Sequence, residues 1–262
     1  MTLTVKTTTY ARIAVELQPP AARVTLSNPP LNVIDIPMME DLRAALELIE
    51  TRPEISAIVF AGSERAFSSG VDIATHTPDK VRGMLAAFHS VIRSMVSNSK
   101  LTIACVRRHC LGGGAELALM CDIVYASPDS VWGFPEIKLG CYPPVAVTAL
   151  AALVGQKHAA DLVLTGRSIT GREAASIGLA NSVVPEVDLE QTVQHAVDHL
   201  SQLSRAALAI NKRAIYSGDA IHFDKGLARA EKTYLDELMK TEDAHEGINA
   251  FLEKREPAWK GK

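Results

Sequence analysis

Three consecutive glycines, Gly112–Gly114, lie between a predicted strand and an apolar helical segment. Glycine allows a tight turn and lets a ligand approach the backbone closely. The first turn of the helix that follows presents unpaired N–H groups and a partial positive charge, so the segment can bind a phosphate or an oxyanion. It is neither a Walker loop nor a GxGxxG loop, because the required residues do not follow. A glycine turn that only lets the helix pack closely on the strand explains the triplet equally well.

Two glutamates accompany this segment. Glu116 falls in the first turn of the predicted helix, and Glu136 follows Pro135 at a loop-to-helix boundary 20 residues later. Apolar residues flank Glu136. Burial in such surroundings raises the pKa of a carboxyl group, so the pair can supply an acid and a base near neutral pH. Either glutamate alone is more often a helix cap or a surface charge.

A second loop, residues 64–72, follows the apolar strand at 55–60 and precedes a helix. Its small residues and Gly70 let the backbone approach a ligand. Loops that follow parallel strands lie at the same edge of a sheet, where open α/β folds bind their ligands. We therefore expect this loop and the glycine segment to contribute to one site.

The remaining pattern alternates strands and helices. Apolar runs at 12–17 and 23–27 predict a hairpin or two neighbouring strands, and further strands are expected at 55–60, 101–106 and 122–126. Apolar residues at helical spacing predict helices over 38–49 and 81–95 and after the glycines. Such alternation is typical of an α/β domain with mostly parallel strands.

The chain changes character after about residue 187, where the strands stop. Apolar residues at helical spacing predict helices over 193–203, 223–238 and 248–252. This helical tail is too small to bury its apolar faces alone, so we expect it to pack on the α/β body or on a second subunit. We divide the chain into a catalytic core, residues 1–190, and a helical C-terminal region, residues 191–262.

Composition narrows the function classes. The 262 residues are 47% apolar and 22% charged, which excludes a disordered or fibrous protein, and a net charge of −3 provides no global basic field for nucleic acid. The apolar stretch at 145–154 is about half of the roughly 20 residues that span a bilayer, so no membrane association is expected. The first residues lack a signal-peptide pattern, so the expected compartment is the cytoplasm. Four cysteines form no CxxC pair, and no metal site is predicted.

Six blocks of the sequence, in order, resemble the enoyl-CoA hydratase/isomerase (crotonase) superfamily along nearly the whole chain. The resemblance implies a spiral of ββα units with a helical C-terminal trimerisation region, assembled as a homotrimer or as a homohexamer. It also implies an acyl-CoA thioester as the substrate, with coenzyme A as part of that substrate and no separate cofactor. The blocks are PLNVID (30–35), ERAFSSGVDI (64–73), LGGGAELALMCDIVYA (111–126), FPEIKLG (134–140), LTGRSITGREAASIGLANSVVP (164–185) and AFLEKREPAWKG (250–261).

The resemblance assigns catalytic roles to four positions. The backbone N–H groups of Val71 and Gly113 would form an oxyanion hole for the thioester carbonyl. Glu116 and Glu136 match the two catalytic glutamates of the hydratases, with the same 20-residue separation. We assign proton donation to carbon to Glu136 and activation of water to Glu116. The thioester would accept the electrons, so no metal or redox cofactor is required.

The resemblance also implies contacts with the substrate. Ser69 would offer its carbonyl to the adenine, and Arg65 lies where a basic residue meets the CoA phosphates. Phe251 and Lys254 match C-terminal positions that reach CoA, often across a subunit boundary. The further expected contacts are Asp72, His76, Tyr142 and Pro144. For His76, a solvated loop histidine is the alternative, because loops lie mostly on the surface.

One position departs from the hydratase pattern. A glycine whose N–H helps to hold the catalytic water in typical hydratases is replaced by Pro144, which has no N–H. The segments 72–81, 30–39 and 140–146 resemble the cyclohexa-1,5-diene-1-carbonyl-CoA hydratases of anaerobic aromatic degradation. We therefore expect hydration of a cyclic dienoyl-CoA, with water received at a different carbon than in a linear enoyl-CoA. The alternatives are a general short-chain enoyl-CoA hydratase, an isomerase or thioester hydrolase, and, least favoured, an RNA-binding or scaffold protein.

Overall fold

The computed structural model describes the backbone of residues 6–262 and their side chains except at 6, 7, 9 and 217–222. The strands are β1 Lys6–Thr9, β2 Ile13–Gln18, β3 Ala21–Leu26, β4 Ala57–Ala61, β5 Ala66–Ser68, β6 Leu101–Val106, β7 His109–Leu111, β8 Ile123–Ala126, β9 Val131–Gly133, β10 Ser168–Thr170 and β11 Ser182–Val183. The α-helices are α1 Ile36–Glu50, α2 Val81–Ser97, α3 Gly113–Leu119, α4 Pro144–Val154, α5 Gln156–Thr165, α6 Gly171–Ser176, α7 Glu186–Ser201, α8 Arg205–Asp236 and α9 Glu242–Leu252. Short 3₁₀ helices are η1 Ile73–Thr75, η2 Pro135–Leu139 and η3 Leu238–Lys240.

Two sheets form the α/β body. The larger has the strand order β1-β2-β3-β4-β6-β8-β11, and the smaller has the order β10-β9-β7-β5. In the larger sheet β1 to β3 are antiparallel, and the pairs from β3 to β11 are parallel. The predicted hairpin and the mostly parallel sheet are therefore confirmed.

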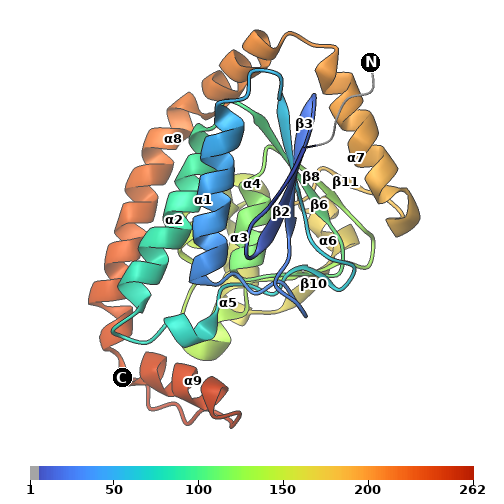
Figure 1. Cartoon of the computed structure of the whole chain (residues 1–262). Helices are drawn as coiled ribbons and strands as arrows, with labels where there is room; N and C mark the ends of the chain where they lie inside the picture. The colour runs from blue at the N-terminus through green and yellow to red at the C-terminus, as the bar shows by residue number, and fades with distance from the viewer. Residues whose placement is uncertain (1–5) are drawn as a thin grey trace.

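The body repeats one unit three times: β4-β5-α2, β6-β7-α3 and β8-β9-α4. In each unit the first strand joins the large sheet and the second joins the small one, so the chain advances as a spiral of ββα turns (Figure 1). The second strands have only three residues each, too few to show an alternating pattern. This is why the sequence pattern predicted the first strand of each unit and missed the second.

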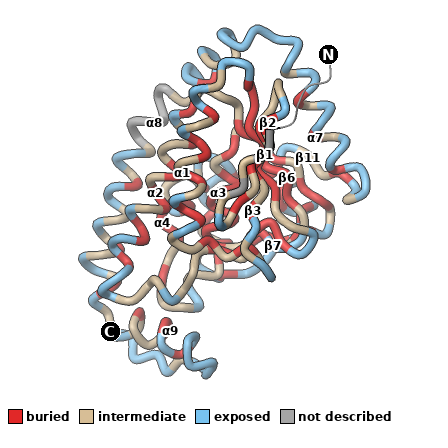
Figure 2. Tube along the Cα trace, in the orientation of Figure 1, coloured by how far each residue is buried: buried red, intermediate tan, exposed pale blue. Residues whose placement is uncertain are grey.

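Helix α1 shows how sequence sets these elements. Asp35 caps its N-terminus, because its carboxylate accepts the N–H of Met38 at 3.0 Å. The buried face of α1 is the one predicted from the spacing, including Leu42 and Ile49. It joins the main core, whereas α7 covers a second core around Val59 and Ile103. Figure 2 shows the buried residues gathered on the strands and on the inner faces of these helices.

The helical tail packs on the body, as predicted. Helix α8 lies against α2 and α4. Lys212 forms an ion pair with Asp122 at 2.9 Å, and Arg93 of α2 bonds Asp224 at 2.8 Å. Residue 190, at which we divided the chain, falls inside α7, which ends at Ser201.

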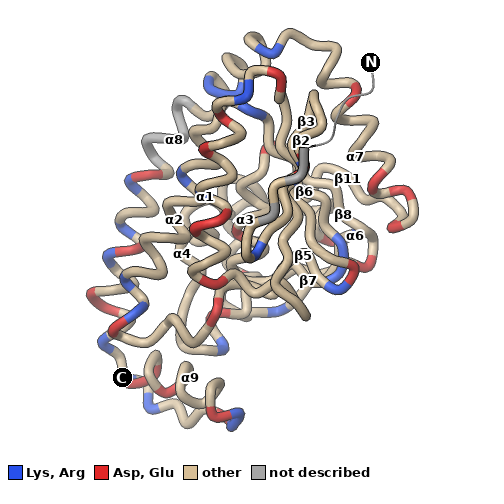
Figure 3. The backbone as a smooth tube through the Cα atoms, in the orientation of Figure 1, with Lys and Arg blue, Asp and Glu red and all other residues tan. Residues whose placement is uncertain are grey.

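The surface carries charges of both signs, and Lys and Arg alternate with Asp and Glu along α8 and α9 (Figure 3). Within residues 6–262, no helix is long and apolar enough to cross a membrane. All four cysteines are buried free thiols.

Candidate active site

The segments that follow β5, β7 and β9 meet in a cavity of about 80 Å³ beneath α8. Both loops expected to share a site do so, and they bring Val71 and Gly113 into the lining. Glu116 of α3 and Glu136 of η2 line the same cavity. The four residues assigned to catalysis are thus together in space, although they span 66 positions of the sequence.

The backbones of Val71 and Gly113 approach each other closely. A β-carbon on Gly113 would lie 3.3 Å from Val71 N and 2.6 Å from Val71 Cγ2, so this contact requires glycine. Val71 pairs with Ile34 in an isolated parallel β-bridge. The Ile34 N–H donates to the Gly70 carbonyl and the Asp72 N–H donates to the Ile34 carbonyl, so the bridge does not use the Val71 N–H. Gly113 is the first residue of α3, where an N–H has no partner within the helix. Two amide donors therefore line one end of the cavity.

Glu116 is held by the beginning of another helix. The N–H groups of Val145 and Ala146, in the first turn of α4, donate to its Oε1 at 2.8 and 2.9 Å. Glu116 is only 3% exposed. Burial raises its pKa to about 7, although the two N–H donors oppose the rise by stabilising the carboxylate. The sequence offered a helix cap or a surface charge as the alternative role of Glu116, but it is buried and the first turn of α4 supplies its partners.

Glu136 has a different environment. Its Oε1 lies against Gly112, where a β-carbon would come within 2.7 Å, and its buried Oε2 has no hydrogen-bond partner among the described residues. Burial, followed by the negative charge of Glu116, raises the pKa of Glu136 to about 8. The pKa values of both carboxyl groups are therefore raised toward neutral pH, and Glu136 holds its proton more firmly than Glu116.

The expected substrate contacts divide into two groups. Those in the cavity lining are Ser69, His76, Tyr142 and Pro144. Those outside it are Arg65, Asp72, Phe251 and Lys254. Asp72 caps η1 through the Ala74 N–H at 3.0 Å. Phe251 is 52% exposed at the end of α9, and Arg65 and Lys254 are also exposed.

His76 lines the cavity and is partly buried, which favours a contact with the substrate over a solvated loop histidine. Its Nδ1 lies 3.2 Å from the carbonyl oxygen of Asp72. Because a carbonyl only accepts, Nδ1 carries the proton and Nε2 keeps its lone pair. Burial lowers the pKa of His76, which keeps the ring neutral near pH 7.

The sequence interpretation missed Tyr234 of α8, which also lines the cavity and is 1% exposed. Its ring packs edge to face on Tyr142, with the centroids 5.2 Å apart. The signal was present in the spacing of the helix predicted over 223–238, because Leu227, Ala230 and Leu238 share one face of it and Tyr234 continues that face.

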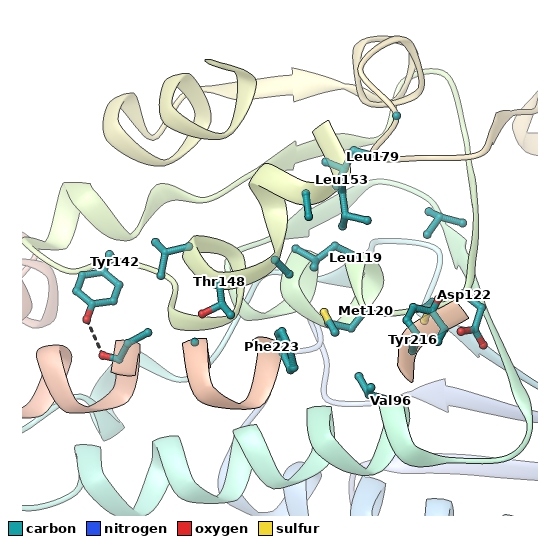
Figure 4. Close-up of a pocket in the computed structure, with 18 of the residues that line it drawn as sticks. Val96, Leu119, Met120, Asp122, Tyr142, Thr148, Leu153, Leu179, Tyr216 and Phe223 are labelled. Carbon is teal, nitrogen blue, oxygen red and sulfur yellow. Dashed lines mark hydrogen bonds between the residues drawn. The ribbon is translucent and has the colours of Figure 1, made fainter. Parts of the chain in front are cut away.

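A larger cavity of about 780 Å³ lies further along α8 and is lined mostly by apolar side chains, among them Leu119, Leu153 and Phe223 (Figure 4). Tyr142 borders both cavities, and its hydroxyl donates to the Ala230 carbonyl at 2.7 Å. The glutamate pair lines only the smaller cavity, so we place the chemistry there. In the described part of the chain, no group of three or more His, Cys, Asp or Glu residues is arranged to hold a metal ion.

A spiral of ββα units with two amide donors beside a buried pair of carboxyls defines a crotonase-fold enzyme. The chain belongs to the enoyl-CoA hydratase/isomerase family, whose pattern matches residues 17–262. This membership confirms the resemblance found in the sequence, and the curated relatives are named as hydratases, which are hydro-lyases.

Curated relatives cover almost the full chain. Cyclohexa-1,5-dienecarbonyl-CoA hydratase of Thauera aromatica is 35% identical over 240 residues, 92% of this chain and 93% of the relative. 2,3-Dehydroadipyl-CoA hydratase of Escherichia coli is 34% identical over 255 residues, 95% of each chain. A probable enoyl-CoA hydratase of Rhizobium meliloti is 36% identical over 254 residues, 96% of this chain and 98% of the relative.

Solved structures share the fold. An enoyl-CoA hydratase of Mycobacterium avium subsp. paratuberculosis has a TM-score of 0.86 at 28% identity and covers 96% of this chain and 100% of its own. An enoyl-CoA hydratase/isomerase of Xanthobacter autotrophicus has a TM-score of 0.85 at 29% identity, with 95% and 100% covered. The predicted ββα spiral is therefore confirmed.

Proposed function

We propose that this protein adds water to an unsaturated acyl-CoA thioester and that its preferred substrate is cyclohexa-1,5-diene-1-carbonyl-CoA. The observation that carries the proposal is the buried Glu116/Glu136 pair, with both pKa values raised toward neutral, beside the amides of Val71 and Gly113. The name of the Thauera aromatica relative supports the choice of substrate.

In the proposed mechanism Glu116 is the base. It takes a proton from water while the water oxygen bonds to the β-carbon of the substrate, and the π electrons move onto the thioester oxygen. The Val71 and Gly113 N–H groups stabilise that oxyanion. Glu136 then delivers its proton to carbon, which restores the carbonyl. The raised pKa of Glu136 keeps this proton available near neutral pH. The thioester accepts the electrons, so the mechanism requires no metal or redox cofactor.

The diene changes where the proton goes. In this ring C1 carries the thioester, and the double bonds are C1=C2 and C5=C6. The negative charge reaches the thioester oxygen only when water adds to C2, because addition to C5 or C6 leaves that charge outside conjugation with the carbonyl. The dienolate that forms can then be protonated at C5, which keeps a double bond conjugated with the thioester. The sequence had suggested a different carbon for the water. The chemistry of this diene indicates instead that water adds to the β-carbon, as in a linear enoyl-CoA, and that the carbon protonated by Glu136 is the one that differs.

Several further expectations belong to this proposal. CoA would contact Arg65 and Ser69 of its own subunit and Phe251 and Lys254 of a neighbouring one, in a cytoplasmic homotrimer or homohexamer. Exposed apolar side chains support an assembly, including Ile215 of α8 at 70% exposure. Ser69 lines the cavity, which suits a contact with the substrate.

A panel of CoA thioesters tests the proposal. The cyclic diene and crotonyl-CoA are incubated with the enzyme in D₂O, and the products are identified by mass and by the position of deuterium. We expect a hydrated product from the diene, with deuterium at C5, and a higher kcat/KM than for crotonyl-CoA. Glu173→Gln is a matched control, because Glu173 is an exposed glutamate outside the cavity.

The same panel separates the alternatives. A kcat/KM for crotonyl-CoA equal to or above that for the diene identifies a general short-chain enoyl-CoA hydratase, which the similarity to the Rhizobium meliloti relative also favours. A product without added water identifies an isomerase, and release of free CoA a hydrolase. RNA binding that weakens when the salt concentration is raised, without turnover of any thioester, would indicate the non-enzymatic alternative.

A further inference from the structure

Two buried polar atoms in the active-site cavity have no strong hydrogen-bond partner in the part of the chain that the structure describes. One is the hydroxyl oxygen of Tyr234 and the other is Oε2 of Glu136. Buried polar groups are nearly always paired, because an unmade hydrogen bond lowers stability. Two unpaired atoms in one cavity therefore indicate a ligand that pairs with both.

The neighbours of Tyr234 already have other partners. The hydroxyl of Tyr142, which packs on its ring, donates to the Ala230 carbonyl at 2.7 Å. The Cys141 thiol donates to the Leu139 carbonyl at 3.5 Å, and its sulfur offers the Tyr234 hydroxyl only a weak acceptor. Tyr234 is thus a donor held in place by packing and without a strong acceptor in the described chain.

The beginning of α4 has no donor left for a water molecule. Pro144 has no N–H, and the N–H groups of Val145 and Ala146 both donate to Glu116 Oε1. The next N–H, of Val147, donates to the Pro143 carbonyl within the helix. A water molecule beside the two glutamates must therefore find its donor elsewhere.

The chemistry of the two unpaired atoms specifies the ligand group. Tyr234 offers an O–H donor, and Glu136 Oε2 can exchange a hydrogen bond with a hydroxyl. A single oxygen that both accepts and donates satisfies them, as water and an alcohol do. Burial keeps the pKa of Tyr234 well above its usual value, so its hydroxyl stays protonated.

We propose that the Tyr234 hydroxyl holds the oxygen that is added to the substrate, first as water and then as the hydroxyl of the product. This inference rests on the proposed function, because it assigns a water-holding donor to that reaction. The hydroxyl touches the reacting oxygen directly and is the donor that α4 does not provide.

Tyr234→Phe tests the role in turnover. The variant keeps the ring and its contact with Tyr142 and removes only the unpaired hydroxyl. We expect kcat for hydration to fall about 10-fold to 100-fold, as for loss of one hydrogen bond to a reacting group, while KM changes less than about threefold. The thermal midpoint should stay equal or rise, because a buried unpaired group is removed. Tyr125→Phe, on the α7 side of the large sheet, should leave kcat unchanged.

A binding experiment tests the same contact with turnover suppressed, in proteins that also carry Glu116→Gln. In that background, titration calorimetry compares 3-hydroxybutyryl-CoA with butyryl-CoA on the protein with Tyr234 and on Tyr234→Phe. We expect the variant to lose about fivefold or more in affinity for the hydroxylated ester and to bind the saturated ester unchanged. Equal effects on both esters, or a kcat within twofold of the wild type, would overturn the inference even if the enzyme is a hydratase. Absence of turnover with every thioester would instead refute the proposed function, and the affinity ratio would still decide the contact of Tyr234 with a hydroxyl.

Discussion

Replacing Glu136 by glutamine should make the protein increasingly more stable than the wild type as the pH rises, while it strongly lowers turnover. The folded-state pKa of Glu136 is raised from 4.5 to about 8, mainly by burial. The folded protein therefore retains a proton that the unfolded chain has released, so the wild type loses stability as the pH rises from about 4.5 to about 8. Glutamine does not titrate, and the variant avoids this loss.

The size of the effect follows from the same values. Integrating the two titrations gives a penalty for the wild type of about 1 kcal/mol at pH 5 and about 4 kcal/mol at pH 8. Glu136→Gln should therefore gain about 3 kcal/mol relative to the wild type between these two pH values. For a chain of this size, that corresponds to roughly 6–12 °C in the midpoint of thermal unfolding. Turnover should fall about 10²-fold or more, because the variant cannot donate the proton to carbon.

The assay is thermal unfolding of both proteins at pH 5 and pH 8, at one protein concentration because assembly shifts the midpoint. Glu173→Gln is the control. The backbone N–H of Thr170 lowers the pKa of Glu173, so this exposed residue is ionised at both pH values and its variant should show no difference between them. The reasoning is refuted if the difference in thermal midpoint between Glu136→Gln and the wild type is the same at pH 5 and pH 8. It is also refuted if the variant becomes less stable relative to the wild type as the pH rises.

Three other outcomes are expected. Glu116→Gln should lower kcat by about 10² or more with little change in CoA-ester affinity, measured by steady-state kinetics and calorimetry; near-normal turnover would remove Glu116 from the mechanism. The pH profile of kcat/KM should be bell-shaped, falling below about 7 as Glu116 is protonated and above about 8 as Glu136 loses its proton; a rate that stays flat from pH 7 to 10 contradicts this. Light scattering at micromolar concentration should give the mass of a trimer or a hexamer, and a monomer mass would exclude both.

The sequence predicted the elements whose patterns are long. The apolar face of α2, which includes Met84, Phe88 and Ile92, has enough helical turns to be recognised, and the buried strand β4 has enough consecutive apolar residues. The three-residue strands of the small sheet have neither, because they are defined by pairing with each other across the spiral. Their existence depends on tertiary contacts that no local pattern carries.

The site was predictable for residues that belong to a local motif. Glu116 follows the glycine triplet, and Glu136 lies in a loop flanked by apolar residues. Tyr234 enters the same cavity from a helix about 100 positions later, and only the packing of α8 on α4 brings it there. A tyrosine on an apolar helix face indicates burial, but its hydroxyl partner depends on which element lies opposite.

The two glutamates have similar surroundings in the sequence, and the fold makes them unequal. Glu116 receives two N–H donors from the first turn of α4, which favour its ionised form, whereas the buried oxygen of Glu136 receives none. Pro144 is part of the cause, since a proline at the first helical position starts α4 and leaves the next two N–H groups directed at Glu116. Pro144, which cannot donate a hydrogen bond to water, thus also begins helix α4, whose first N–H groups hold Glu116. This asymmetry supports the proposed assignment of the base to Glu116 and of the acid to Glu136, because the carboxyl that loses its proton first is the one suited to receive the proton of water.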